Sequence, residues 1–328
     1  MSLSLAVVGA TGLVGRTMLK VLEERNFPFD RITLLASERS AGKRVKFNGK
    51  YHTVAKLDEK SFNGIDIALF SAGGGTSRHF APIAANAGTV VIDNSSAWRM
   101  EKSVPLVVPE VNPDAAFKHK GIIANPNCST IQLVVALKPL HDTFSLRRVI
   151  VSTYQSISGA GQSGVDQLIA ELKGKQLENP KFSRQVAFNT IFHSFPEGSD
   201  STEEELKMVN ETRKIMGLPR LPITVTCVRI PTTGAHAEAV NIECERSISV
   251  TRARKTLERA PGIVLLDDPS NDRYPTILDA EDRDEVFVGR VRKDPSRSMS
   301  LNMWVVADNL RKGAATNAVQ IAELLRGS

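Results

Sequence analysis

Cysteine and long apolar runs are both scarce in this chain of 328 residues. The three cysteines, Cys128, Cys227 and Cys244, are too few and too scattered for a disulfide framework, which favours a reducing compartment. No apolar run approaches the ~18 residues of a membrane helix. The first residues also lack the basic segment of a secretory signal. We therefore expect a cytoplasmic protein that does not associate with membranes.

Concentrated charge of one sign is missing as well. Lysine and arginine number 42 against 36 acidic residues, and the surplus of six is spread along the chain without a basic tail. Since nucleic-acid-binding proteins concentrate basic residues in a patch, we expect small anionic ligands and no nucleic acid. Neither a C-x-x-C nor an H-x-x-x-H motif occurs, so we expect no metal site.

The chain is otherwise ordinary for a globular protein, with 41% hydrophobic and 24% charged residues. Its length predicts two domains. In the first, apolar runs alternate with segments of helical periodicity that begin near Leu13 and Thr76. The expected strands lie at residues 3–8, 32–36, 65–70, 89–93 and 122–124. This alternation predicts parallel βαβ units in a doubly wound sheet over residues 1–127.

After Cys128 the pattern changes to a β-rich series interrupted by helices. The expected strands are 149–156, 223–230, 237–244, 285–291 and 300–306, and the expected helices are 129–142, 163–173, 201–216 and 313–325. The strands alternate apolar and polar residues, which is typical of antiparallel sheets. The fold class predicted for the chain is therefore α/β, a Rossmann-type doubly wound parallel sheet followed by an α+β domain.

Three glycines, Gly9, Gly12 and Gly15, form G-x-x-G-x-x-G directly between the first strand and the first helix. Glycines at these positions permit a tight turn and let backbone N–H groups approach a pyrophosphate. A purely structural turn is the alternative. Because the motif lies in the strand–turn–helix context that it requires, we predict a dinucleotide site. The site would comprise Gly9, Thr11, Gly12, Leu13, Val14 and Gly15.

The end of the second strand bears on which dinucleotide binds. The segment reads Ser37-Glu38-Arg39-Ser40. An acidic residue there would accept the ribose hydroxyls of NAD, whereas serine and arginine would hold the 2′-phosphate of NADP. We predict NADP, bound through Ser37, Arg39 and Ser40, with Glu38 leaving NAD as the alternative.

Cys128 lies between the strand at 122–124 and a helix that begins near Ser129. A helix N-terminus favours the thiolate, whereas Cys227 and Cys244 fall within strand patterns typical of buried cysteines. Among the histidines, His236 alone follows a strand-end loop rich in turn residues. A dinucleotide, a thiolate and an imidazole together predict aldehyde oxidation through a thioester. Anionic parts of the substrate would be held by basic side chains, for which Arg99, Lys207 and Arg229 are candidates.

At this point the chain resembles the aspartate-β-semialdehyde dehydrogenase family over nearly its whole length. The motifs are Gly9–Gly15, Ser95–Met100, Asn125–Thr130, Gln155 with Ser158–Gly161, Glu204–Lys207, Arg229 to Glu238, and Asp308–Leu310. One departure stands at the base, where the family commonly has Gly-His-Ser-Glu and this chain has Ala235-His236-Ala237-Glu238.

The resemblance implies a role for each matching residue. Cys128 would be the nucleophile, His236 the acid/base, and Gln155 the group that orients the substrate. Arg229 would bind the α-carboxylate and Glu204 the amine of the substrate. Arg99 and Lys207 would hold the phosphate, although Glu204 and Lys207 could also form an ordinary ion pair on a helix surface. The remaining implied contacts are Asn127 to the substrate and Ser158, Gly159 and Asn309 to the nicotinamide end.

The implied activity is the NADP-dependent, reversible conversion of L-aspartyl-4-phosphate to L-aspartate-4-semialdehyde and phosphate. This is the branch-point step toward lysine, threonine and methionine. Residues 128–312 would form the catalytic and dimerisation domain, and residues 313–328 would join 1–127 in the dinucleotide-binding domain. A homodimer or a dimer of dimers is implied.

Two alternatives remain. An N-acetyl-γ-glutamyl-phosphate reductase shares the chemistry, but an acetylated amine would not need a carboxylate partner such as Glu204. A catalytically silent paralogue that binds a dinucleotide is disfavoured because Cys128, His236 and Arg229 occur together. Glyceraldehyde-phosphate dehydrogenase is more distant, since its Ser-Cys-Thr-Thr-Asn motif is missing from the sequence.

Overall fold

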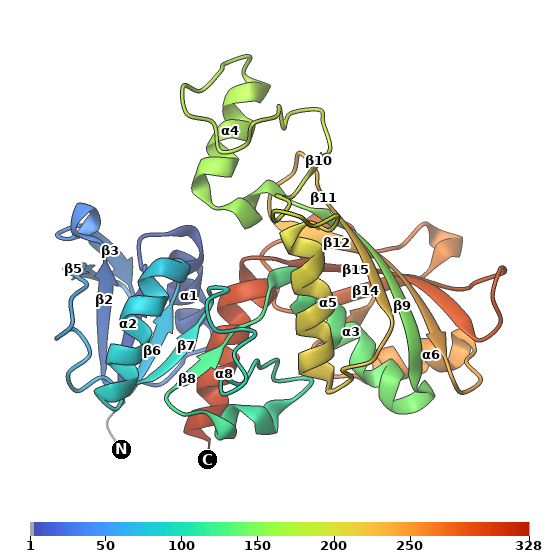
Figure 1. The fold of residues 1–328 in the computed structure, drawn as a ribbon, viewed down its shortest axis with the longest axis horizontal. Helices are drawn as coiled ribbons and strands as arrows, with labels where there is room; N and C mark the ends of the chain where they lie inside the picture. The colour runs from blue at the N-terminus through green and yellow to red at the C-terminus, as the bar shows by residue number, and fades with distance from the viewer. Residues whose placement is uncertain (1–2, 328) are drawn as a thin grey trace. The chain divides into compact units, whose positions relative to one another are not determined.

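The computed structural model describes residues 3–327 (Figure 1). Its contacts divide the chain into two compact units. The first unit comprises Met1–Asn127 and Ala314–Ser328, and the second comprises Cys128–Gly313. The chain therefore leaves the first unit immediately before Cys128 and returns to it immediately after Gly313.

The first unit is built on a six-stranded parallel sheet with the order β5-β2-β1-β6-β7-β8. Its strands are β1 (Ser4–Val8), β2 (Arg31–Ala36), β5 (Ala55–Lys56), β6 (Ile67–Phe70), β7 (Val90–Asp93) and β8 (Ile122–Ala124). Strand order reverses at β1, so the loop after β1 lies at the switch point where open parallel sheets bind ligands. The predicted doubly wound parallel sheet is confirmed.

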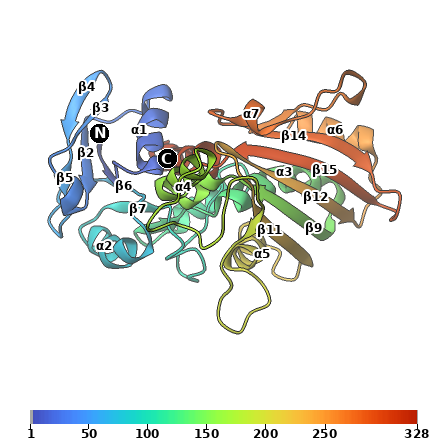
Figure 2. The ribbon, with the colours of Figure 1, turned by 90° about the horizontal axis from the view of Figure 1, so that it is seen from above.

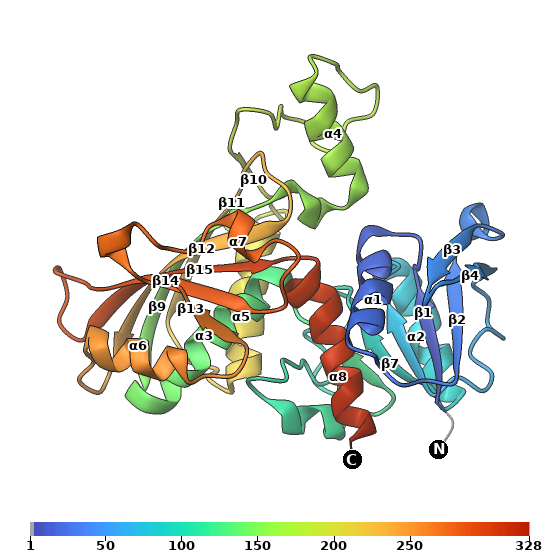
Figure 3. The ribbon, with the colours of Figure 1, turned by 180° about the vertical axis from the view of Figure 1, so that it is seen from behind.

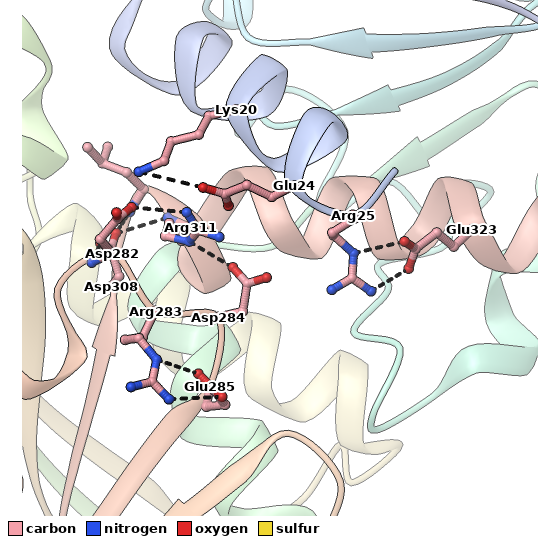
Figure 4. Close-up of polar contacts among 11 residues, drawn as sticks. Lys20, Glu24, Arg25, Asp282, Arg283, Asp284, Glu285, Asp308, Arg311 and Glu323 are labelled. Atoms are coloured by element: carbon pink, nitrogen blue, oxygen red, sulfur yellow. Dashed lines mark hydrogen bonds and ion pairs between the residues drawn. The ribbon is translucent and has the colours of Figure 1, made fainter. Parts of the chain in front are cut away.

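Helix α1 (Leu13–Glu24) and helix α8 (Thr316–Arg326) pack together in this unit, although about 290 residues of chain separate them. Both contribute side chains to a core that also contains Leu5 and Val7 of β1. Helices α1 and α8 lie side by side in Figure 3, and the guanidinium of Arg25 donates to both carboxylate oxygens of Glu323 at 2.8 and 2.7 Å, which ties the end of α1 to α8 (Figure 4). Helix α2 (Gly74–Asn86) contacts β7 and β8.

A small hairpin in the first unit was not predicted from the sequence. Strands β3 (Arg44–Phe47) and β4 (Lys50–Thr53) pair antiparallel around Asn48 and Gly49, both of which have positive φ. Asn-Gly is the preferred dipeptide for such a two-residue turn, so the signal was present in the sequence.

The second unit contains a seven-stranded sheet with the order β10-β11-β9-β12-β15-β14-β13. Its strands are β9 (Leu146–Gln155), β10 (Ile191–Phe192), β11 (Ile223–Arg229), β12 (Ala235–Cys244), β13 (Ile263–Leu265), β14 (Val286–Lys293) and β15 (Ser300–Asp308). The expectation of antiparallel strands is wrong for two pairs, because β11 runs parallel to β9 and β13 runs parallel to β14. The chain between β9 and β11 includes two helices and is long enough for the crossover that a parallel pair requires.

Helix α3 (Cys128–Phe144) lies against β9, β12, β14 and β15 of this sheet, with α5 (Glu203–Met216) and α6 (Val250–Glu258) packed on either side of it (Figure 2). Helix α5 begins with a capping box, in which Thr202 and Glu205 each accept from the other's backbone N–H. Helix α4 (Gln162–Leu172) and the chain around it extend away from the sheet near β10 and β11 (Figure 1). Helix α7 (Ile277–Ala280) covers β12 and β15.

Candidate active site

Three predicted site residues of the second unit stand on neighbouring strands. Arg229 of β11 lies opposite Gln155 of β9, and His236 of β12 follows in the same row, next to the pair Ala237–Tyr154. Because paired strands place opposite residues on the same face, these three side chains form a row across the sheet. We call Arg229, Gln155 and His236 the active row.

Cys128 is the first residue of α3, and the first turn of this helix contains no acidic side chain. Its side chain is partly exposed, whereas Cys227 and Cys244 are buried. Burial raises the pKa of the Cys227 thiol far above its ordinary value and that of Cys244 to about 11. A charge on Cys128 would raise the pKa of Arg229, so these two groups attract one another. Of the three thiols, Cys128 is thus the one that is partly exposed and lies at a helix N-terminus, the setting that favours a thiolate.

The turn that follows β15 places the backbone of Gly313 in close contact with Cys128. A Cβ placed on Gly313 would lie 2.8 Å from the Cβ of Cys128. The turn is a π-helix over Arg311–Ala315, and Arg311 anchors it by donating to Asp284 Oδ1 at 2.8 Å and to Asp282 Oδ1 at 3.0 Å (Figure 4). Only glycine leaves room for the thiol at this point.

Gln155 connects the helix of Cys128 to helix α5. Its Nε2 donates to Ser129 Oγ at 2.8 Å and to Glu204 Oε1 at 3.2 Å. Gln155 and Glu204 are both buried. Ser129 was not singled out from the sequence, although it directly follows the predicted nucleophile.

The sequence left open whether Glu204 and Lys207 form an ordinary ion pair on a helix surface or belong to the site. The structure has features of both. Lys207 Nζ lies 3.5 Å from Glu204 Oε2, so the ion pair within α5 exists. It is not an ordinary surface pair, however, because Glu204 is buried against Gln155 while Lys207 stays about one-third exposed. The arrangement leaves an ammonium group at the edge of a buried carboxylate.

Arg229 is held by three neighbours. It donates to Ser156 O and lies against His193 Nδ1, both at 3.4 Å, and its guanidinium stands 5.5 Å from the ring centre of Phe182. Burial lowers the pKa of Arg229, and the charge of Glu204 opposes that shift. Burial and the charge of Arg229 lower the pKa of His193 to about 4, so His193 is neutral at pH 7. The sequence left His193 undetermined, and this residue directly follows β10, which is too short to show a pattern.

His236 is fully buried, and its ring is oriented by Ser156. The Ser156 backbone N–H donates to Nδ1 at 3.0 Å, and Ser156 Oγ lies 3.1 Å from the same nitrogen. This hydrogen-bond network assigns the proton of the neutral ring to Nε2. Nε2 has no hydrogen-bond partner among residues 3–327. Burial and Arg229 lower the pKa of His236 to about 3.

Two of the residues expected at the nicotinamide end join this network. Asn309 Oδ1 accepts hydrogen bonds from Ser158 Oγ at 3.0 Å and from Ser156 Oγ at 3.1 Å. A Cβ on Gly159 would lie 3.2 Å from His236 Nε2, so this glycine keeps space open beside the ring. Ser158, Gly159 and Asn309 are thus grouped around His236.

The glycine loop of the first unit has the geometry that the sequence predicted for it. Gly9 adopts φ +84°, and a Cβ on Gly15 would clash with the carbonyl oxygen of Gly9. Gly12 is the N-cap residue of α1 and offers no side-chain cap. Thr11, Leu13 and Val14 complete the loop and the first turn. The first N–H groups of α1 are therefore available to an anionic group.

In the segment after β2, the acidic residue is paired with a lysine, whereas the serines and the arginine beside it are not in that pair. Glu38 pairs with Lys56 at 2.8 Å, and this contact lowers the pKa of the Glu38 carboxyl. Ser37 and Arg39 are exposed, whereas Ser40 is buried. A cavity of about 490 Å³ beside the glycine loop has a largely basic lining that includes Thr11, Arg16, Lys20, Lys43, Arg44 and Lys46.

Two predicted substrate residues, Arg99 and Asn127, belong to the first unit. Arg99 is buried and donates to Asn125 O at 3.0 Å and to Asn94 O at 2.9 Å. Asn127 is also buried and immediately precedes Cys128. Their predicted partner in phosphate binding, Lys207, belongs to the second unit.

Over residues 3–327, no helix is both long enough and apolar enough to span a membrane. In the same part of the chain, no three histidine, cysteine or acidic side chains gather in a way that could hold a metal ion.

Comparison with known proteins gives a consistent result for both units. Residues 4–119 match the family described as semialdehyde dehydrogenase, NAD binding domain, and residues 137–312 match its dimerisation domain. The chain is 57% identical to an aspartate-semialdehyde dehydrogenase of Aquifex aeolicus, covering 99% of this chain and 98% of the relative.

Solved structures agree with these matches. Aspartate semialdehyde dehydrogenase II of Vibrio cholerae, complexed with ASA, superposes with a TM-score of 0.95 at 50% identity, covering 100% of this chain and 99% of that one. The aspartate semialdehyde dehydrogenase of Candida albicans, solved with NADP, has a TM-score of 0.78 at 26% identity, with 99% of each chain covered.

Proposed function

Because the chain belongs to the aspartate-semialdehyde dehydrogenase family, we propose that it reduces L-aspartyl-4-phosphate to L-aspartate-4-semialdehyde with NADPH, through an acyl thioester on Cys128. The observation that carries this proposal is the position of Cys128. It begins α3 in the same unit as Gln155, Arg229 and His236, and Gln155 is bonded to the next residue of the helix, Ser129.

The covalent step belongs to Cys128. Its thiolate attacks the acyl carbonyl of the substrate, a C–S bond forms, and the C–O bond to phosphate breaks. The reduced nicotinamide, when bound, supplies a hydride to the thioester carbonyl. The C–S bond then breaks, which releases the aldehyde and returns the thiolate.

His236 interacts with the oxygen of the reacting carbonyl. Its Nε2–H donates to this oxygen as negative charge develops there. When the ring carries a second proton, Nδ1–H has Ser156 Oγ as an acceptor 3.1 Å away. From that charged form the ring can give its Nε2 proton to the carbonyl oxygen, and as the Nδ1–H tautomer it can take the proton back at Nε2 in the oxidative direction.

The other predicted residues hold the substrate. Arg229 presents a planar guanidinium, which pairs with the α-carboxylate through two parallel hydrogen bonds. Glu204 receives the substrate ammonium group, and this pairing favours an aspartyl substrate over an acetylated one. Lys207 and Arg99 bind the phosphate, and Asn127 completes the substrate contacts next to the nucleophile.

The NAD-binding family match supports a nicotinamide cofactor, and we assign NADP specifically. The carboxylate of Glu38 is engaged by Lys56, whereas Ser37 and Arg39 are exposed for a 2′-phosphate. The Candida albicans relative was solved with NADP. Ser158, Gly159 and Asn309 would serve the nicotinamide end of the same cofactor.

The match to a dimerisation domain supports a homodimer. Sedimentation velocity distinguishes it from the dimer of dimers that the family resemblance also implies. The product would enter lysine, threonine and methionine synthesis. Three cysteines without a disulfide fit a cytoplasmic location.

One assay tests the proposed function directly. The purified protein should reduce NADP with L-aspartate-4-semialdehyde only when phosphate is present, and should use NAD much less efficiently. Turnover independent of phosphate, or a preference for the N-acetylglutamate semialdehyde, would contradict the proposal.

A further inference from the structure

A second row of polar side chains lies directly beneath the active row. Two residues back along β11 and β9, and two residues forward along β12, stand Cys227, Thr153 and Glu238. Thr153 is opposite both of the others in the strand register. We call these three residues the inner polar row. All three are 0% exposed.

The next row on the same face is apolar, with Val225, Val151 and Val240. An ionisable acid within this sheet is therefore not explained by packing, which the valine row achieves without polar groups. Burying an unpaired polar group costs free energy, and burying an unpaired charge costs much more. A buried glutamate at this place requires a reason.

Helix α3 brings one polar side chain to the inner polar row. Gln132 lies one turn after Cys128, is 1% exposed, and lowers the pKa of the Glu238 carboxyl through its side-chain amide. Hydrogen bonds of ordinary geometry are nevertheless missing in the described part of the chain for both Glu238 oxygens, both Gln132 amide atoms and Thr153 Oγ1. These unpaired atoms all belong to buried side chains, where an unmade hydrogen bond is costly.

The surroundings of Glu238 disfavour its charged form. Burial raises its pKa well above the ordinary value of 4.5. On the neighbouring positions of this face, the titratable groups are His236 on the same strand and Cys227 on β11, both of which burial keeps neutral. Helix α5 adds Glu204 and Glu205 on the β11 side, where Glu205 accepts from the backbone N–H of Cys227. The facing residues of α3, β9 and β15 are Gln132, Thr153 and Val305, and none of these titrates.

We propose that Glu238 is a positioning residue that works in its protonated form, and that with Gln132 it fixes the first turn of α3 and so the direction of the Cys128 thiol. A neutral carboxyl can donate its O–H to the amide oxygen of Gln132 and accept from the amide N–H. The inference rests on the proposed function, in which Cys128 is the nucleophile.

Three variants test this role. Glu238→Gln keeps a neutral side chain of the same size, Glu238→Ala removes it, and Val240→Ala is the matched control in the apolar row of the same strand. For each we would measure kcat, KM and the pH dependence of Cys128 alkylation by iodoacetamide, with the adduct located by mass spectrometry.

We expect Glu238→Gln to keep most of the parent kcat and an unchanged thiol pKa, since no charge is lost. Glu238→Ala should lower kcat by roughly 10- to 100-fold with little change in KM, because a small misplacement of a reacting group is costly. Val240→Ala should reduce stability but keep the kcat of the folded enzyme.

Two results would overturn the inference. A lower thiol pKa in Glu238→Gln would show that the parent carries a buried anion, and equal kcat values for Glu238→Ala and Val240→Ala would show that Glu238 only fills space. Failure of the proposed function looks different, because alkylation of Cys128 in the parent enzyme would then leave turnover intact.

Discussion

At the scale of single residues, the site depends on the geometry of Arg229. The guanidinium is held by Ser156 O, His193 and the ring of Phe182. Arg229→Lys should reduce kcat/KM by an amount equivalent to about 2–4 kcal/mol, because an ammonium cannot pair with a carboxylate through two parallel bonds. Steady-state kinetics with L-aspartate-4-semialdehyde measure this loss. A change of less than twofold would remove Arg229 from carboxylate binding.

Lys207 tests whether phosphate has its own anchor. Its ammonium stands 3.5 Å from the buried Glu204 and remains partly exposed. Lys207→Ala should raise KM for phosphate in the oxidative direction and change KM for the semialdehyde much less. Lys214→Ala, on the same helix, is the control. If KM for phosphate is the same in both variants, Lys207 serves only the ion pair with Glu204.

Glu238 should also make the free energy of unfolding depend on pH. Its pKa is raised in the folded protein, so above pH 4.5 the unfolded chain loses a proton that the folded chain retains. Folding stability conferred by this group is therefore complete below that pH and is lost as pH rises. Glu238→Gln removes this pH dependence. Its free energy of unfolding should therefore rise relative to that of the parent between pH 5 and pH 8. Urea denaturation at several pH values measures the difference, and a gap independent of pH would contradict it.

At the scale of elements, features set by neighbouring residues in the sequence could be predicted. Features set by contacts between distant parts of the chain could not. The glycine loop was predictable because Gly15 packs on the Gly9 carbonyl oxygen of the same loop and Gly9 adopts a positive φ, although the close contact that Gly9 makes with Ser71 lies far along the chain. The parallel pairing of β9 and β11 was not, since alternation of apolar and polar residues is the same for either direction. His193 reaches Arg229 from the position directly after β10, a strand of only two residues, which leaves no periodic signal.

The π-helix after β15, Arg311–Ala315, gives a second prediction at the scale of elements. Gly313 presses on Cys128, and Arg311 fixes the turn through Asp282 and Asp284. Gly313→Ala should displace the thiol and lower kcat by roughly 10-fold or more. Gly74→Ala is the control, because a Cβ there would meet nothing within 4 Å. Equal kcat in the two variants would mean that the turn yields without moving Cys128.

At the scale of the whole molecule, the chain closes its first unit with a helix from its far end. Helix α8 packs with α1, β6 and β7, and the pair Arg25–Glu323 ties the two helices together. Amphipathic periodicity predicted that this helix exists, but only the family resemblance indicated which unit it joins. An apolar stripe shows that a helix is buried without showing against what.

The central claim is that one thiol, Cys128, carries the acyl group during turnover. Mass spectrometry of the intact enzyme mixed with L-aspartyl-4-phosphate, without nicotinamide, measures it most directly. We expect one acyl adduct per active site, mapped to Cys128 by peptide analysis and missing from Cys128→Ser. An adduct on Cys227 or Cys244, or turnover by Cys128→Ser at the parent rate, would contradict the account.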